Sequence, residues 1–176
     1  MFTVRHATPA DVSNIYTLYK KVAVTPFGIA RSPEEVTHEY VEGFTRKAAL
    51  SGIQLVIDNP AGATGIVAEI HCAQFEPKIF KHVLADLTIA VHPDFQGKGI
   101  GRMIFTHLLD LIKNDRPDIL RVELISRETN LKAISFYESL GFKREGKLEK
   151  RIKGEANEFE ADIPMGWINP NYKNPS

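Results

Sequence analysis

Three glycines lie within five positions in the middle of the chain: Gly97, Gly99 and Gly101. They follow an apolar run that ends at Val91, and they precede a segment whose apolar residues recur at helical spacing. A helix N-terminus leaves four backbone N–H groups unpaired and carries about half a positive charge. A loop without side chains lets a pyrophosphate approach those amides directly, and Lys98 and Arg102 add mobile positive charge. The spacing therefore predicts a phosphate site at Gln96, Gly97, Lys98, Gly99, Ile100, Gly101 and Arg102.

The glycine loop fits neither of two common phosphate motifs. No Lys-Ser or Lys-Thr pair follows a G-x-x-x-x-G frame, so the loop is not a Walker A motif. Arg102 stands where the dinucleotide pattern G-x-G-x-x-G needs its last glycine, and several elements precede the loop. A tight structural turn is the alternative interpretation. Such a turn needs only one glycine, and each glycine at a helix start costs about 1 kcal/mol relative to alanine.

The elements that must position this loop follow from periodicity and from turn residues. Ser32 with Glu35 forms a capping box that predicts the start of a second helix, and Gly141 ends the last one. Turns are expected at 59–62 and 153–157. The element order βααββ(β)αβαββ predicts an α/β fold of the α+β type, with a mixed, mostly antiparallel twisted sheet and helices on both faces. Strands are expected at 2–6, 54–58, 65–73, 83–91, 121–126, 142–151 and 159–167, and helices at 9–22, 32–50, 130–140 and directly after the glycine loop.

Length and composition predict a single domain over residues 1–168 and a loosely ordered C-terminal tail over 169–176. Lys+Arg and Asp+Glu both number 22, which argues against a nucleic-acid binder. No run approaches the roughly 18 apolar residues of a membrane span, and charged residues interrupt any secretory signal near the start. Cys72 is the single cysteine, so we expect a reducing, cytoplasmic setting. The six histidines lack metal-ligand spacing, so we interpret them as structural or surface residues and expect no metal.

Two stretches resemble the GNAT superfamily of N-acetyltransferases. Residues 91–101, VHPDFQGKGIG, are similar to the acetyl-CoA loop of that family, Q/R-x-x-G-x-G/A. Residues 130–142, NLKAISFYESLGF, are similar to its second motif, N-x-x-A-x-x-F-Y-x-x-x-G-F. The two motifs stand in the family's order. The resemblance is close over residues 83–144 and rests on element order elsewhere.

The resemblance implies a GNAT-like single domain, acetyl-CoA as the acyl donor, and roles for the residues that match the motifs. In the family, the strand before the glycine loop splays from its neighbour and pairs with the pantetheine arm, so the backbone of Ile89 and Val91 is the expected contact. Asn130 stands where the family uses an amide side chain near the pantetheine, and it is equally suited to cap the following helix. Tyr137 matches the position from which many members protonate the departing thiolate. A packed aromatic residue is the alternative for Tyr137.

The acceptor amine must lose a proton before it attacks the thioester, because an ammonium group has no lone pair. An alkyl amine with a pKa of about 10 is almost entirely charged at neutral pH. A carboxylate that receives the proton, directly or through water, is therefore expected. Asp86 stands near the start of the strand on which family members often carry a glutamate base, and Glu69 on the preceding strand is the second candidate. For either residue, a surface charge is the alternative interpretation.

Cys72 invites a covalent acyl-enzyme, but strand alternation groups it with Ile66 and Ile70, so we interpret it as a core residue and expect direct transfer. The resemblance implies an acceptor site at residues 24–32 and 74–82, whose aromatic and basic residues suit an amine that also carries an acidic group. We therefore expect an N-acetyltransferase, monomer or homodimer, that acts on a small-molecule amine and has no nucleic-acid or membrane partner. The alternatives are a CoA-binding sensor or scaffold without catalysis and a protein N-terminal acetyltransferase.

Overall fold

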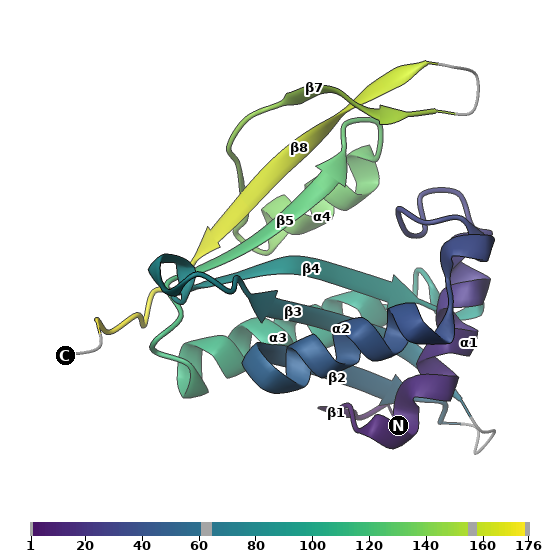
Figure 1. The fold of residues 1–176 in the computed structure, drawn as a ribbon, viewed down its shortest axis with the longest axis horizontal. Helices are drawn as coiled ribbons and strands as arrows, with labels where there is room; N and C mark the ends of the chain where they lie inside the picture. The colour runs from purple at the N-terminus through teal and green to yellow at the C-terminus, as the bar shows by residue number, and fades with distance from the viewer. Residues whose placement is uncertain (1, 61–64, 155–157, 175–176) are drawn as a thin grey trace. The chain divides into compact units, whose positions relative to one another are not determined.

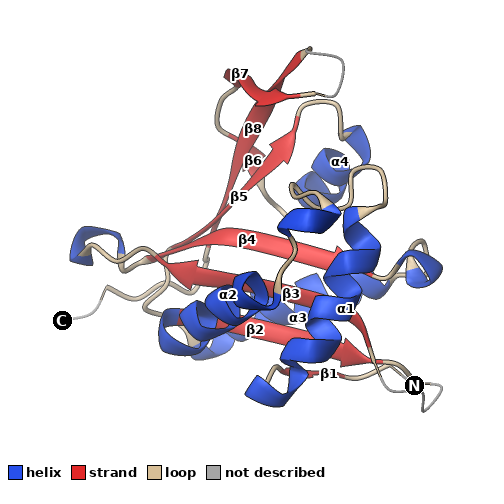
Figure 2. Ribbon diagram, turned by 45° about the vertical axis from the view of Figure 1, so that its right-hand side comes forward, coloured by secondary structure: helices blue, strands red, loops and turns tan. Residues whose placement is uncertain are grey.

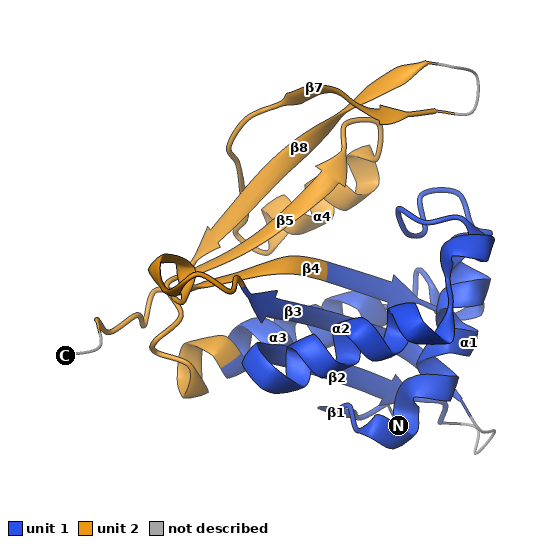
Figure 3. Ribbon diagram, viewed as in Figure 1, with its two compact units in different colours: residues 1–74, 88–111 blue, residues 75–87, 112–176 orange. Residues whose placement is uncertain are grey.

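The computed structural model describes residues 2–60, 65–154 and 158–174. Contacts divide the chain into two compact units (Figure 3). The first unit comprises residues 1–74 and 88–111, and the second comprises residues 75–87 and 112–176. Within the described residues, no helix is long and apolar enough to cross a membrane.

The first unit is a layer of strands between helices. Antiparallel pairing joins β1 to β2 and β2 to β3. In this unit, α1 and α2 cover one face of β2 and β3, and α3 lies on the other face (Figures 1 and 2). The elements are β1 (Val4–His6), α1 (Val12–Ala23), α2 (His38–Ser51), β2 (Gly52–Asp58), β3 (Ile66–Gln74), the second half of β4 (Val83–Val91) and most of α3 (Ile100–Asp115), with 3-10 turns at Pro9–Asp11, Pro33–Glu35 and Pro93–Phe95.

The core of the first unit follows from helical spacing. Ile15, Leu18, Tyr19 and Val22 recur three and four residues apart in α1, and all four are buried. They pack in one cluster with Val41 of α2 and with residues of β2 and β3. The helix predicted for this stretch is therefore confirmed, with a 3-10 turn in place of its first residues.

The second helix begins later than the sequence predicts. Ser32 and Glu35 form the expected capping box, with a Glu35 carboxylate oxygen 2.8 Å from the Ser32 backbone nitrogen, but the box opens only a single 3-10 turn. Val36 then adopts an extended backbone and buries its side chain, and this burial interrupts the helix. Thr37 caps α2 instead, and its hydroxyl oxygen accepts a hydrogen bond from the Tyr40 backbone nitrogen at 3.1 Å.

The second unit is built on the long antiparallel pair of β5 and β8. Their register runs from Arg121 opposite Ile168 to Arg127 opposite Asp162. The strand predicted at 142–151 is instead two shorter strands, which residues 145–147 separate. The elements are the first half of β4, a 3-10 turn at Lys78–Phe80, β5 (Arg121–Arg127), α4 (Leu131–Ser139), β6 (Lys143–Arg144), β7 (Leu148–Lys153) and β8 (Phe159–Ile168).

The first residues of the predicted C-terminal tail are hydrogen bonded within the second unit. The Asn169 side-chain amide is buried and donates to the Ile119 carbonyl oxygen at 2.9 Å. Lys173 donates its backbone N–H to the Pro117 carbonyl oxygen at 2.8 Å. Parts of the predicted turns at 59–62 and 153–157, and the end of the tail, lie outside the described residues.

Hydrogen bonds order the strands β1-β2-β3-β4-β5-β8-β6, and β7 pairs with β8. The pair of β4 and β5 is parallel, whereas β1 with β2, β2 with β3, and β8 with β5, β6 and β7 are antiparallel. The predicted α/β fold with a mixed, mostly antiparallel sheet is confirmed. Its division into a domain of 1–168 and a tail stays a prediction.

Candidate active site

The glycine loop leaves open space where side chains would stand. Gly97 and Gly99 have φ angles of 73° and 80°, a conformation that residues with a Cβ atom rarely adopt. No atom of the described chain lies within 4 Å of a Cβ built at either glycine. At Gly101, a Cβ would meet Val91 Cγ2 at 3.6 Å and Ile89 Cδ1 at 3.9 Å. At Gly97 and Gly99 the loop therefore has open space on the side where a side chain would stand.

The loop is fastened at both ends. The Gln96 side-chain amide donates a hydrogen bond to the Val91 carbonyl oxygen at 3.1 Å, which ties the loop to the end of β4. At the other end, the Met103 backbone N–H donates to the Gly99 carbonyl oxygen at 2.9 Å. The intervening amides of Ile100 and Gly101 belong to the first turn of α3, where the helix supplies no acceptor. These donors are positioned to receive an anion.

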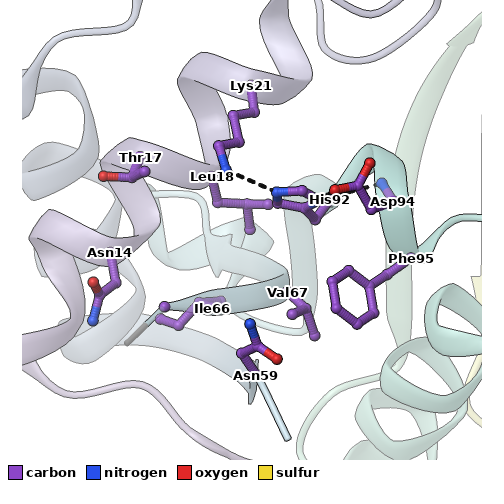
Figure 4. A pocket seen from close by; sticks show the side chains of 11 residues that line it. Asn14, Thr17, Leu18, Lys21, Asn59, Ile66, Val67, His92, Asp94 and Phe95 are labelled. Atoms are coloured by element: carbon purple, nitrogen blue, oxygen red, sulfur yellow. Dashed lines mark hydrogen bonds and ion pairs between the residues drawn. The ribbon is translucent and has the colours of Figure 1, made fainter. Parts of the chain in front are cut away.

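A pocket of about 260 Å³ lies in the first unit beside the segment that leads into the loop (Figure 4). Its walls come from α1, β3 and residues 92–95. His92 Nε2 lies 3.0 Å from Lys21 Nζ, and His92 Nδ1 accepts the Asp94 backbone N–H at 3.2 Å. Burial and the Lys21 charge lower the pKa of His92, against the opposing effect of Asp94. The ring is therefore uncharged at neutral pH, and Lys21 carries the positive charge of the pocket.

Strand β4 carries the predicted pantetheine contacts and one predicted base. Strand β4 pairs with β5 at the start of both strands, where Val83 lies opposite Arg121 and Leu84 lies opposite Val122. Asp86 is exposed and has a φ of 54°, which is uncommon for a residue with a side chain. Strained backbone positions concentrate at functional sites, so Asp86 stays a candidate. Ile89 and Val91, in the half of β4 that belongs to the first unit, are both half-buried.

Tyr137 and Asn130 lie on α4 and at its start, in the second unit. Tyr137 is half-buried, with ring centres 5.5 Å from Phe136 and 6.2 Å from Phe142. Burial raises the pKa of Tyr137 to about 12, so its hydroxyl stays protonated at neutral pH. Asn130 Oδ1 accepts a hydrogen bond from the Ala133 backbone nitrogen at 3.1 Å, which confirms its role as a helix cap. A contact of Asn130 with pantetheine stays a prediction.

Glu69 is fully buried in a group of polar side chains, here called the Glu69 cluster: Tyr19, Gln54, Glu69 and His71. The Tyr19 hydroxyl donates to Glu69 Oε2 at 2.7 Å, and the Gln54 amide donates to Glu69 Oε1 at 2.8 Å. His71 Nδ1 lies 3.0 Å from Glu69 Oε1. A proton can therefore reach the Glu69 carboxylate only through these neighbours.

Sequence reasoning did not identify His71, Tyr19 or Gln54 as functional. Glu69 and His71 stand two residues apart in an apolar strand, which places both on one face. That spacing is a signal, but it does not reveal what the face contacts. Of the remaining candidates, the first unit holds the glycine loop, Ile89 and Val91, and the second holds Asp86, Asn130 and Tyr137. In the described part of the chain, no group of three or more His, Cys, Asp or Glu residues could hold a metal ion.

A family model described as an acetyltransferase (GNAT) domain matches residues 55–144, more than half of the 176 residues. The chain belongs to the GNAT family. This is the family that the two motifs predicted, and the matched range contains both the glycine loop and Tyr137.

Two curated relatives match this chain over stretches of different length. The ribosomal protein bS18-alanine N-acetyltransferase of Salmonella typhimurium is 48% identical over 54 residues, which cover 31% of this chain and 35% of that protein. The chain thus spans about a third of the length of that relative. The L-amino acid N-acyltransferase MnaT of Escherichia coli K12 is 24% identical over 141 residues, covering 80% of this chain and 78% of that protein.

Solved GNAT structures support the fold. A GNAT superfamily phosphinothricin acetyltransferase from Sinorhizobium meliloti, solved in complex with AcCoA, superposes with a TM-score of 0.80 at 15% identity. The superposition covers 99% of this chain and 93% of that one. At this identity the likeness concerns the fold alone.

Proposed function

We propose that this GNAT protein transfers the acetyl group of acetyl-CoA directly to the primary amine of a small molecule. The observation that carries the proposal is the glycine loop, whose two positive-φ glycines leave open space beside the backbone at the start of α3. A pyrophosphate fits such a site because backbone donors and the helix dipole both favour negative charge. Lys98 and Arg102 lie in the same stretch and would add positive charge.

The residues present fit acetyl-CoA along the first unit. The pyrophosphate would be held at Gln96, Gly97, Lys98, Gly99, Ile100, Gly101 and Arg102. The backbone of Ile89 and Val91 would pair with the pantetheine arm, although the Val91 carbonyl already accepts the Gln96 amide. That bond leaves the backbone of Ile89 as the stronger of the two predicted pantetheine contacts. In the second unit, the Asn130 side-chain nitrogen is available because the cap uses only the oxygen.

Proton handling requires one donor and one acceptor. Tyr137 would donate a hydrogen bond to the departing sulfur. Its pKa of about 12 lies well above the value of about 8.5 for a free thiol, so complete proton transfer to the thiolate is uphill. The phenol therefore stabilises the developing charge, and solvent completes the protonation. The ammonium proton would leave through Asp86 or through the Glu69 cluster.

Direct transfer is supported by the position of Cys72. Its side chain is fully buried in β3. Alternation along β3 turns it to the face opposite His71. Because the Cys72 side chain has no exposed surface, a covalent acetyl-cysteine is not part of the proposed route.

The acceptor class is supported by a relative whose name specifies an amino acid substrate, an L-amino acid N-acyltransferase. Residues 24–32 add Arg31, which could receive an acceptor carboxylate. A second candidate is acetylation of a protein N-terminus. The 54-residue match to a ribosomal protein alanine N-acetyltransferase favours it.

Steady-state kinetics tests the proposed function. Release of CoA would be measured with a panel of free amino acids, simple amines and an alanine-terminated peptide, each at several concentrations against acetyl-CoA. We expect intersecting double-reciprocal lines with an amino acid, because both substrates must be bound together. Parallel lines with radiolabelled acetyl recovered on Cys72 would overturn direct transfer. A preference for the peptide would establish the second candidate, and no release with any amine would leave a CoA-binding module.

A further inference from the structure

The Glu69 cluster places a buried carboxylate behind a histidine. Glu69 has no exposed surface, and in the described chain no Lys or Arg side chain pairs with it. Its partners are the Tyr19 hydroxyl, the Gln54 amide and the His71 ring. Burying an ionised group is costly unless it is paired and hydrogen bonded. Three donors from α1, β2 and β3 supply that compensation.

The hydrogen-bond pattern fixes which His71 nitrogen carries a proton. A carboxylate only accepts, so Nδ1, 3.0 Å from Glu69 Oε1, must be the protonated nitrogen. The Tyr19 hydroxyl also lies 3.4 Å from His71 Nδ1, but it donates its hydrogen to Glu69 Oε2 at the shorter distance of 2.7 Å. Glu69 is therefore the acceptor for the Nδ1 proton. The neutral ring therefore carries its lone pair on Nε2.

The ring is held rigidly, yet Nε2 is not sealed from solvent. Phe44 of α2 stacks on His71 with ring centres 4.0 Å apart and an interplanar angle of 6°. Among described residues, the one fully buried side-chain oxygen or nitrogen without a partner is Thr45 Oγ1. His71 Nε2 has no hydrogen-bond partner in the described chain and is not among the fully buried atoms, so it retains some exposed surface, although His71 as a whole is buried with 6% of its surface exposed. A locked imidazole with an accessible lone pair is suited to accept a proton.

Tyr40 links the same cluster to the segment predicted to bind the acceptor. The Tyr19 ring packs edge-on against Tyr40, with centres 6.2 Å apart. The guanidinium of Arg31, at the end of residues 24–32, lies 4.0 Å from the centre of the Tyr40 ring. Burial raises the pKa of Tyr40, as does the Glu69 charge, while Arg31 lowers it, so Tyr40 stays neutral at working pH. Among the described residues, these contacts link His71 to two charged groups, Glu69 on its own strand and Arg31 beyond Tyr40.

We propose that His71 is the general base of the acetyl transfer and that Glu69 is the positioning residue behind it. The inference rests on the proposed function and names the proton route within it. The acceptor ammonium breaks one N–H bond, and the proton forms an N–H bond at Nε2. The resulting imidazolium is stabilised by Glu69 through Nδ1–H. The amine lone pair then forms the C–N bond, the C–S bond breaks, and the electron pair leaves on the thiolate, which takes one proton. The second nitrogen proton goes to solvent.

The critical test is the pH dependence of His71→Asn. The asparagine amide nitrogen stands where Nδ1 stood, so it keeps the donor to Glu69 while removing Nε2. A positioned base contributes about 100-fold or more, so we expect kcat at pH 7 to fall about 100-fold. Above pH 7, the ratio of the wild-type kcat to that of His71→Asn should shrink by about tenfold per pH unit, because an amine with a pKa of about 10 then deprotonates without a base. The Kd for acetyl-CoA should not change.

Two controls separate the base role from packing. His38→Asn removes an imidazole that also stacks on an aromatic ring, with centres 3.9 Å from Tyr16, but that is exposed and outside the cluster. It should keep the wild-type rate at every pH. Glu69→Gln keeps the shape of the side chain and removes its charge, so kcat should fall by about tenfold without a change in the KM for acetyl-CoA.

The outcomes distinguish the base role of His71 from the proposed acetyl transfer itself. A His71→Asn deficit that is equal at all pH values, or no deficit at all, overturns the base role while the proposed function stands. If His71→Asn does not fold, His71→Gln is measured in its place under the same criteria. If the wild-type protein neither binds acetyl-CoA by calorimetry nor releases CoA with any amine, the proposed function fails, and the base role fails with it.

Discussion

The glycine loop and the Glu69 cluster lie in the same compact unit, yet they are built in opposite ways. The loop offers backbone amides from consecutive residues and is exposed, with open space at Gly97 and Gly99. The cluster offers side-chain atoms from three separate elements and is buried. In the proposed account, the loop binds its ligand because side chains are missing, whereas the cluster acts through side chains that hydrogen bond to one another.

This difference determines how each site fails. A backbone site tolerates changes in neighbouring side chains and is destroyed by added bulk. A buried side-chain site is destroyed by removing a single atom, because each remaining donor loses its partner. Substitutions that add or remove atoms should therefore have opposite consequences at the two sites.

The largest effect on folding is expected from Glu69→Leu. The substitution leaves the Tyr19 hydroxyl, the Gln54 amide and the His71 ring without their acceptor, so the free energy of unfolding should fall by about 3–5 kcal/mol. Urea denaturation measures the change. Glu42→Leu, on the exposed surface of α2, should cost less than about 0.5 kcal/mol. Equal costs at the two positions would contradict the view that the cluster depends on side-chain pairing.

An effect of intermediate size, on kcat, is expected from Tyr137→Phe, which removes only the hydroxyl oxygen of the side chain. If the hydroxyl stabilises the departing thiolate, kcat should fall about 10-fold to 100-fold, as expected for one hydrogen bond to a charged group. Binding of acetyl-CoA should be unaffected. Tyr172→Phe removes a hydroxyl that bonds to Asn174 in the same unit and should leave the rate unchanged. A full rate in Tyr137→Phe would mean that Tyr137 is only a packing residue.

A smaller effect is expected at the ion pair between Arg5, which is partly exposed, and Asp11, which is buried. Arg5 donates twice to Asp11 at 2.8 Å, and these bonds, with those from Thr8, lower the pKa of Asp11 to about 2 from 3.8. The stabilisation is complete above pH 3.8 and is lost as the pH falls through about 2. Because Arg5 is partly exposed and screened, the loss should be about 1–2 kcal/mol. Denaturation of Asp11→Asn should lack this pH dependence; an unchanged profile would rule out Asp11 as its source.

The same contrast explains what the sequence could predict. The glycine loop, the start of α3 and the Asn130 cap depend on residues within a few positions, so local patterns predicted them. The Glu69 cluster joins residues up to 52 positions apart, from Tyr19 to His71, and no local pattern specifies such a meeting. Val36 shows the same limit in the fold, since its burial ends a turn that the capping box predicted to continue.

Calorimetric titration of acetyl-CoA into the wild-type protein, Gly99→Val and Gly43→Val tests the central claim most directly. Both glycines have open space around a built Cβ, but only Gly99 has a positive φ and lies in the loop. We predict that Gly99→Val binds at least about 100-fold more weakly, since charge-assisted amide contacts contribute about 1.5–3 kcal/mol each. Gly43→Val should bind as the wild type does. A folded Gly99→Val protein with wild-type affinity would contradict the assignment of the loop as the acetyl-CoA site.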